Sequence, residues 1–152
     1  MLKKTIKYED YNGVERTEDF YFNLTKAEIF EMEMGTEGGL VEQLQTVVAA
    51  KKQHEIIKFF KNIVLKAYGK KSADNRLFLK TDENGIPYSR EFEYHPAYSI
   101  MFMELATDDK KGAEFVNGIM PKDLAEKAQE YIKNHPEVAN GEAPLAIPAA
   151  ND

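Results

Sequence analysis

The Asn12-Gly13 dipeptide is the feature that most constrains the fold of this 152-residue chain. β-branched and aromatic residues lie on both sides of it, and Asn-Gly favours a tight hairpin turn because both residues tolerate positive φ. The pattern predicts antiparallel strands over residues 3–9 and 14–22. Because side chains alternate along a strand, Phe20 and Phe22 share one face. That face should therefore be covered by the rest of the protein.

Helices are predicted after the hairpin. Thr25 precedes Glu28 by three residues, which is the spacing of a capping box that begins a helix at Lys26, and Gly35 should end that helix. Apolar residues recur at helical spacing in five later segments. These segments begin at Leu40, His54, Pro96, Asp108 and Pro121.

The segment that begins at His54 has the clearest amphipathic pattern. Lys58, Asn62 and Lys66 form a polar line at steps of four, opposite a broad apolar face. Gly69 is placed to end this helix in the left-handed conformation. Core packing is the favoured role for the apolar face, in preference to a nucleic-acid platform built on its phenylalanines.

Two regions are less regular. A second Asn-Gly at 84–85 is compatible with another short hairpin, in which Pro87 must lie at an edge because it cannot donate to a ladder. Residues 134–152 hold three prolines and no periodicity, which is typical of a disordered tail. The predicted fold class is α+β, mainly helical, with an N-terminal antiparallel hairpin. We expect one globular domain over residues 1–133 and a disordered Pro/Ala-rich tail over 134–152.

Composition narrows the function classes. The chain has no cysteine, which excludes thiol nucleophiles, disulfides and cysteine-based metal sites. A formal charge of −6 argues against a general nucleic-acid binder. No apolar run approaches the roughly 20 residues that cross a bilayer. We therefore expect a soluble, cytoplasmic protein that binds neither nucleic acid nor membrane.

The sequence contains no strong catalytic motif. The sequence "EFEYH" places Glu91, Glu93 and His95 on one side of an extended strand, and these are suitable ligands for zinc or manganese. Strand alternation alone gives the same arrangement when Phe92 and Tyr94 point inward. The serines lie in no nucleophile elbow, and the paired carboxylates sit among other acids. The favoured interpretation is a protein that is not an enzyme and needs no cofactor.

An apolar binding face is the remaining hypothesis. Apolar residues almost encircle the helix predicted at 96–107, so this helix either lies in the core or faces a partner. Methionine adapts to irregular surfaces and is common in binding grooves. The candidate partner-binding residues are Tyr98, Met101, Phe102, Met103, Phe115 and Met120.

Three stretches carry a family resemblance: "DYNGVERTEDFYFNLTKAEIFEME", "IIKFFKNIVLKAYGKKSADNRLF" and "AYSIMFMELATDDKKGAEFVNGIMP". Together they resemble the tail assembly chaperones of long, non-contractile-tailed phages and prophages of Gram-positive bacteria. The resemblance covers about residues 1–125. It lies in the order of the pieces: the Tyr-Asn-Gly hairpin, "FNLTKAEI", "KAYG", "FMELATD" and "FVNGI".

The resemblance implies a non-enzymatic chaperone in the cytoplasm of the host bacterium. Such a chaperone is expected to bind the tape-measure protein, help the major tail (tube) protein polymerise around it, and be absent from the mature virion. Self-association into a homo-oligomer is left open. Two alternatives also stay open: a small metal-dependent hydrolase that uses Glu91, Glu93 and His95, and an inhibitor or regulatory module that binds a folded host protein.

Overall fold

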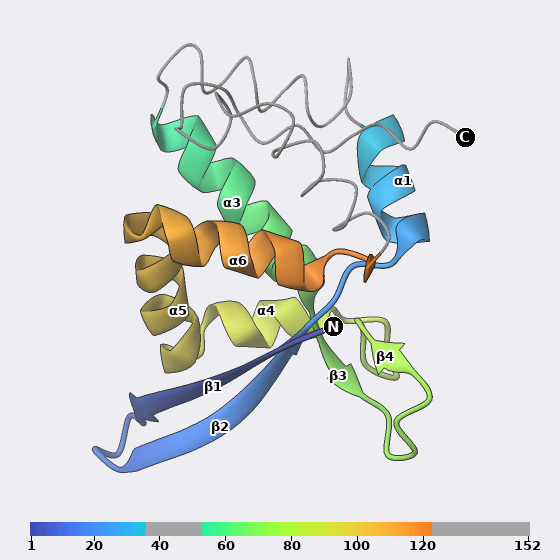
Figure 1. Ribbon diagram of the computed structural model, residues 1–152. Coiled ribbons are helices and arrows are strands. Elements are labelled where there is room, and N and C mark those ends of the chain that lie inside the picture. Colours follow the sequence, from blue (N-terminus) through green and yellow to red (C-terminus); the bar gives the residue numbers. More distant parts are fainter. Residues whose placement is uncertain (36–52, 123–152) are drawn as a thin grey trace. The chain divides into compact units, whose positions relative to one another are not determined.

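The computed structural model describes residues 1–35 and 53–122. An antiparallel hairpin at the N-terminus is followed mainly by helices, which confirms the predicted α+β class. The chain divides into two compact units: unit 1 (Met1–Asn23 and Phe60–Ile119) and unit 2 (Leu24–Phe59 and Met120–Asp152). The elements, labelled in Figure 1, are β1 (Leu2–Glu9), β2 (Glu15–Phe22), α1 (Lys26–Met34), α3 (Gln53–Ala67), β3 (Tyr68–Lys71), β4 (Phe78–Leu79), α4 (Tyr88–Glu93), α5 (Pro96–Thr107) and α6 (Asp109–Ile119).

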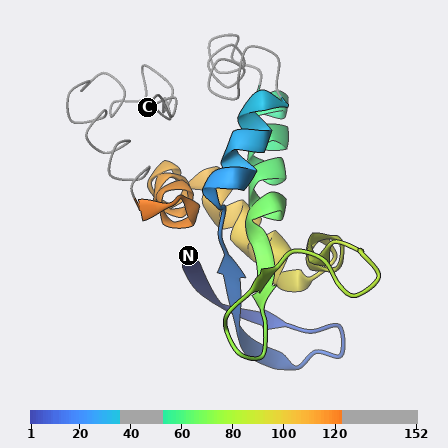
Figure 2. The same ribbon diagram turned by 90° about the vertical axis from the view of Figure 1, so that its right-hand side faces the viewer.

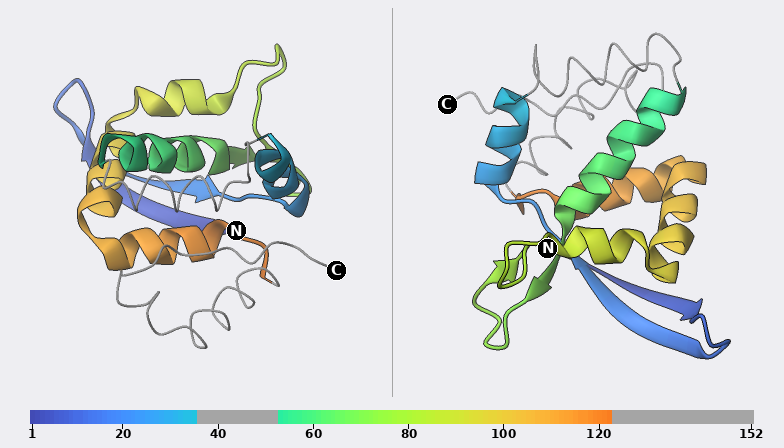
Figure 3. Two further views of the ribbon diagram at one scale, coloured as in Figure 1. Left: turned by 90° about the horizontal axis from the view of Figure 1, so that it is seen from above. Right: turned by 180° about the vertical axis from the view of Figure 1, so that it is seen from behind.

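The N-terminal hairpin forms as predicted. All eight residues of β1 pair with β2, from Leu2 opposite Phe22 to Glu9 opposite Glu15. Gly13 adopts a φ of 79° in the turn, a conformation that glycine reaches without steric cost. The Asp10 carboxylate fixes the turn, because it accepts hydrogen bonds from the Val14 amide and the Arg16 side chain. The tip of the hairpin extends beyond the helices of unit 1 (Figures 1 and 3).

The four strands form one sheet in the order β1-β2-β3-β4. β3 continues directly from α3 (Figure 2) and pairs with β2 only at Tyr21 and Phe22. Beyond that point β2 and β3 diverge, so within residues 1–35 and 53–122 most of β2 pairs with β1 alone.

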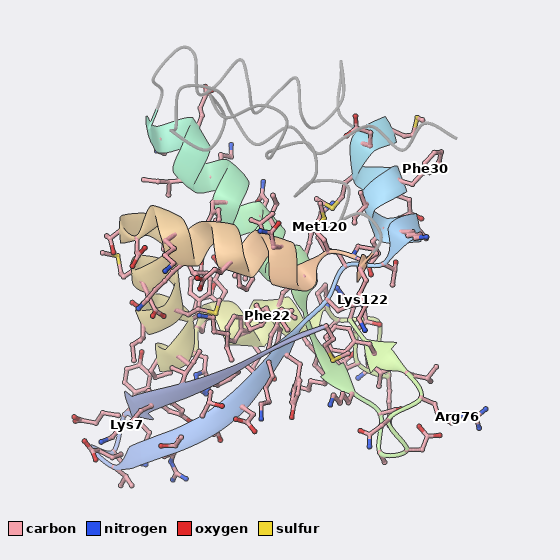
Figure 4. The ribbon with its side chains drawn as sticks, viewed as in Figure 1. Lys7, Phe22, Phe30, Arg76, Met120 and Lys122 are labelled. Atoms are coloured by element: carbon pink, nitrogen blue, oxygen red, sulfur yellow. The ribbon has the colours of Figure 1, made fainter. Side chains whose placement is uncertain are left out.

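Aromatic rings fill the core of unit 1 around Phe22, which is labelled in Figure 4 and is fully buried. The ring centroid of Phe22 lies 5.3 Å from that of Phe115 and 5.7 Å from those of Tyr68 and Phe92. Tyr68 and Phe92 stack with centroids 4.1 Å apart. These rings come from β2, β3, α4 and α6, so the aromatic cluster joins the sheet to the helices that cover it.

The helix α3 has the predicted polar line and much of the predicted apolar face, but Ile57, expected on the apolar face, is 47% exposed, and the predicted end of the helix is wrong. Ile63, Val64 and Ala67 are buried, whereas the predicted polar line is exposed. Gly69 does not adopt a positive φ and lies inside β3. A Cβ atom at this position would lie 2.7 Å from the Leu79 carbonyl oxygen and from the Phe78 ring. Close approach of β4, and not a left-handed helix end, therefore accounts for this glycine.

In unit 2, the capping box of α1 is present. The Glu28 amide donates to Thr25 Oγ1, and the Thr25 amide donates to Glu28 Oε1. The helices predicted from Leu40 and from Pro121 lie largely or wholly outside the described residues. The tail at 134–152 also lies outside them, so the division into a domain at 1–133 and a tail stays a prediction.

The second Asn-Gly forms a turn, with Gly85 at a φ of 79° and a bridge between Thr81 and Pro87. After this bridge the chain enters α4, so the Asn-Gly turn does not join two full strands.

Candidate partner-binding surface

α5 has well-defined ends. Pro96 occupies its first turn, where a missing amide proton costs little, and His95 Nδ1 accepts a hydrogen bond from the Ala97 amide at 3.1 Å. The helix ends before Asp108, whose side chain accepts from the first amides of α6. These caps fix the start and the end of the helix.

The inner face of α5 belongs to the core. Ala97, Met101 and Leu105 recur at steps of four and are all buried. In an α-helix, residues four apart lie on the same side. α5 packs through this side with β1, α4 and α6, its neighbours within unit 1.

The opposite side of α5, its outer face, is exposed and uncharged. Met103 is 57% exposed and Ile100 is 45% exposed. The Thr107 hydroxyl donates to the Met103 carbonyl oxygen at 2.6 Å, so its hydrogen-bonding proton is used within the helix. In a chain with 30% charged residues, an exposed helix face without charge is the kind of surface that binds a partner. The residues of the outer face are Ser99, Ile100, Met103, Ala106 and Thr107.

Only one charged residue lies on α5, and it is neutralised by its neighbours. Glu104 Oε1 is 2.6 Å from Lys111 Nζ, and Glu104 Oε2 is 3.9 Å from Lys4 Nζ. The hydrogen bond from Lys111 lowers the pKa of Glu104. The carboxylate is therefore tied to α6 and β1, on the flank of the helix.

The structure separates the six predicted partner-binding residues. Met103 lies on the outer face, and Tyr98 and Phe102 are half-buried on its flank with their rings stacked at a centroid distance of 5.7 Å. Met101, Phe115 and Met120 are buried, so they cannot contact a partner in this conformation.

Ile100 belongs to the outer face but was not among the six predicted residues. The burial of Ala97, Met101 and Leu105 sets the phase of the helix and leaves Ile100 outside. Apolar character alone could not reveal this phase, because both sides of the helix are apolar.

A second exposed apolar pair lies in unit 2. Phe30 and Met34 of α1 are 60% and 69% exposed, and their spacing of four puts them on one side of the helix. Phe30 is labelled in Figure 4. α1 has no buried residue, and Phe30 and Met34 are its exposed large apolar side chains.

The predicted metal arrangement is wrong, because the segment that holds Glu91 and Glu93 is helical. Side chains two residues apart point in different directions on a helix, whereas on a strand they share a face. Glu93 Oε1 lies 2.6 Å from Lys61 Nζ, and His95 caps α5. Tyr94, expected to point inward, is 77% exposed. Across residues 1–35 and 53–122, no group of three or more potential ligands could hold a metal ion.

Comparison with protein families decides the class of this protein. A family model described as "Phage tail assembly chaperone" matches residues 1–149. The chain belongs to this family. No curated protein and no solved structure matches it. Membership confirms the resemblance noted from the sequence, while the restriction to non-contractile-tailed phages of Gram-positive bacteria stays a prediction.

The protein is therefore a chaperone that acts in the assembly of phage tails from tail proteins. Within the part of the chain that the structure describes, no helix is long and apolar enough to cross a membrane.

Proposed function

We propose that this chaperone binds the tape-measure protein of its phage through the outer face of α5, keeps that protein soluble, and promotes polymerisation of the tail tube around it. The observation that carries the proposal is the exposed, uncharged side of a helix that is otherwise packed into the core. Family membership supports a role in tail assembly, and the outer face supplies a surface for it.

The tape-measure protein is expected to be long and helical, with apolar stripes that have no tube around them before assembly. Such stripes aggregate unless another apolar surface covers them. Ile100, Met103 and Thr107 recur at spacings of three and four, which is the spacing that meets a second helix along its length. The flexible thioether of Met103 suits stripes of irregular shape.

The charge of the chain supports the same role. A net charge of −6 would keep the complex soluble by repulsion between complexes. Because the outer face itself is uncharged, burying it costs no desolvation of a charged group.

Coexpression with the cognate tape-measure protein tests this proposal. We expect the wild-type chaperone to move that protein from the insoluble to the soluble fraction, in a complex that survives purification. Met103→Glu should abolish the rescue, because it places a charge where the apolar stripe docks. Tyr11→Glu is the matched control, since Tyr11 is an exposed apolar residue at the hairpin tip, and this variant should rescue like wild type.

Two results would count against the proposal. If the wild-type chaperone leaves the tape-measure protein insoluble, the proposed partner is wrong. If Phe30→Glu abolishes rescue while Met103→Glu does not, the partner is right but the binding face lies on α1.

A further inference from the structure

One edge of β2 is open, and the register shows which backbone groups it presents. The Asp10 amide donates to the Val14 carbonyl oxygen, so hydrogen-bonded pairs between β1 and β2 fall at even-numbered residues. The N–H and C=O groups of the odd-numbered residues of β2 therefore point away from β1. The bond from the Asn23 amide to the Ala67 carbonyl oxygen, on the β3 side, agrees with this assignment.

β3 covers only the end of this edge. It pairs with Tyr21 and Phe22, and within residues 1–35 and 53–122 no strand or side chain hydrogen-bonds the backbone of Thr17 or Asp19 on that side. In the described part of the chain, Thr17 and Asp19 thus present two donors and two acceptors in line on an extended strand. Such an edge is a template for one more strand.

A cleft adjoins the open edge, and residues of both β2 and β3 line it. It has a volume of about 650 Å³. Phe20 and Tyr68 are among the residues that line it, and so is Asp19 of the open edge. The residues that line the cleft come from β2, from β3 and its turn, and from α4 and His95. A segment added to β2 would place alternate side chains in this space.

The charged residues of the cleft come from three elements. Glu18 on β2 and Glu91 on α4 are exposed carboxylates that line it, and Glu18 Oε2 also accepts a hydrogen bond from the Tyr8 hydroxyl at 2.6 Å and lies 3.6 Å from His95 Nε2. Burial, together with the charges of Glu91 and Glu18, raises the pKa of Tyr68 to about 12. On the β3 wall, Lys70 Nζ lies 4.5 Å from the centre of the Tyr88 ring and Lys71 Nζ lies 4.3 Å from that of Tyr21. β2 and α4 therefore supply the carboxylates of the cleft, and β3 supplies its lysines, of which Lys71 lies over the ring of Tyr21 on β2.

We propose that the open edge of β2 binds an extended segment of a partner protein by β-strand addition, and that this segment carries a lysine or arginine whose charge lies between Glu18 and Glu91. Backbone hydrogen bonds to Thr17 and Asp19 supply the affinity, and the two carboxylates select the basic side chain. This inference goes beyond the proposed function and does not depend on the outer face of α5.

The acidic residues also decide against one other occupant, the C-terminal segment of this chain. For a second copy the charges balance, because antiparallel pairing of two β2 edges centred on Thr17 would place Glu15 opposite Asp19, which is repulsive, and Arg16 opposite Glu18, which is attractive. The chain's own residues 134–152 contain three acidic residues and no lysine or arginine. Charged residues commonly protect an edge strand from aggregation. Here the acidic residues repel an acidic segment but admit a basic one.

Binding of a short synthetic peptide to the full chain tests the inference. The probe alternates threonine and valine around one central lysine, and its control has glutamate in place of that lysine. In amide NMR spectra, the lysine peptide should shift the resonances of Thr17 and Asp19 most strongly. Glu91→Lys should weaken binding about five- to tenfold, because it replaces an attraction at an exposed site by a repulsion. The glutamate peptide should bind more weakly by a similar factor.

Position 17 provides a second, backbone-level test. Thr17→Pro removes the amide proton on the open side and keeps the bonds to β1, so it should abolish peptide binding. Thr17→Ala keeps that proton and should bind like wild type. Equal binding of the two peptides, an unaffected Glu91→Lys variant, or no shift at Thr17 and Asp19 at about 1 mM peptide would overturn the inference. If Thr17→Pro fails to fold, the amide resonance shifts of the wild-type chain and the peptide affinity of Glu91→Lys still test the inference.

Discussion

Phe22→Ala should lower the free energy of unfolding by about 3 to 5 kcal/mol. The side chain of Phe22 is fully buried, and its ring meets those of Tyr68, Phe92 and Phe115. Truncation removes the transfer energy of the ring and leaves a cavity among three rings that come from separate elements. Urea denaturation, followed by circular dichroism, measures the loss.

Phe30→Ala is the matched control, since it makes the same chemical change at a side chain that is 60% exposed. It should cost less than about 0.5 kcal/mol. Equal losses in the two variants would show that the aromatic cluster around Phe22 is not the centre of the core.

Met101→Glu should unfold the chaperone or destabilise it by more than about 4 kcal/mol, whereas Met103→Glu should stay within about 0.5 kcal/mol of wild type. Met101 is 1% exposed, so a carboxylate there would be buried without a partner. Met103 is two residues away on the outer face, where water solvates the new charge. Thermal unfolding of the two variants, which carry the same substitution, measures the difference.

This pair also determines how the rescue experiment is interpreted. Both methionines were predicted partner-binding residues, but the structure leaves only Met103 accessible. If Met103→Glu unfolds the protein as well, the outer face is covered in solution and cannot be the docking surface.

Local patterns predicted the elements whose causes are local. Asn12-Gly13 predicted the hairpin because the turn depends on the φ angles of two neighbouring residues. Thr25 and Glu28 predicted the start of α1 because a capping box is complete within four residues. Both predictions agree with the structure almost residue for residue.

Predictions failed where the structure of a segment depends on distant parts of the chain. Gly69 resembles a helix terminus in sequence, but its role is set by β4, which approaches it from about ten residues further along. The alternation in "EFEYH" predicted a strand. There the short helix α4 instead buries Phe92 against Tyr68 and exposes Tyr94.

The helix at 96–107 was predicted correctly, while its role as a binding site stays a prediction. Apolar residues surround α5, so the sequence could not show which side faces the core. Packing against β1, α4 and α6 settles the orientation and leaves Ile100 and Met103 outside.

Site-specific photo-crosslinking tests the central claim most directly. A photo-reactive amino acid in place of Met103, in cells that also produce the tape-measure protein, should give a covalent product of the two chains, which mass spectrometry would identify. The same amino acid at Tyr11, on the hairpin tip, should give none. Crosslinks from position 11 but none from position 103 would contradict the claim.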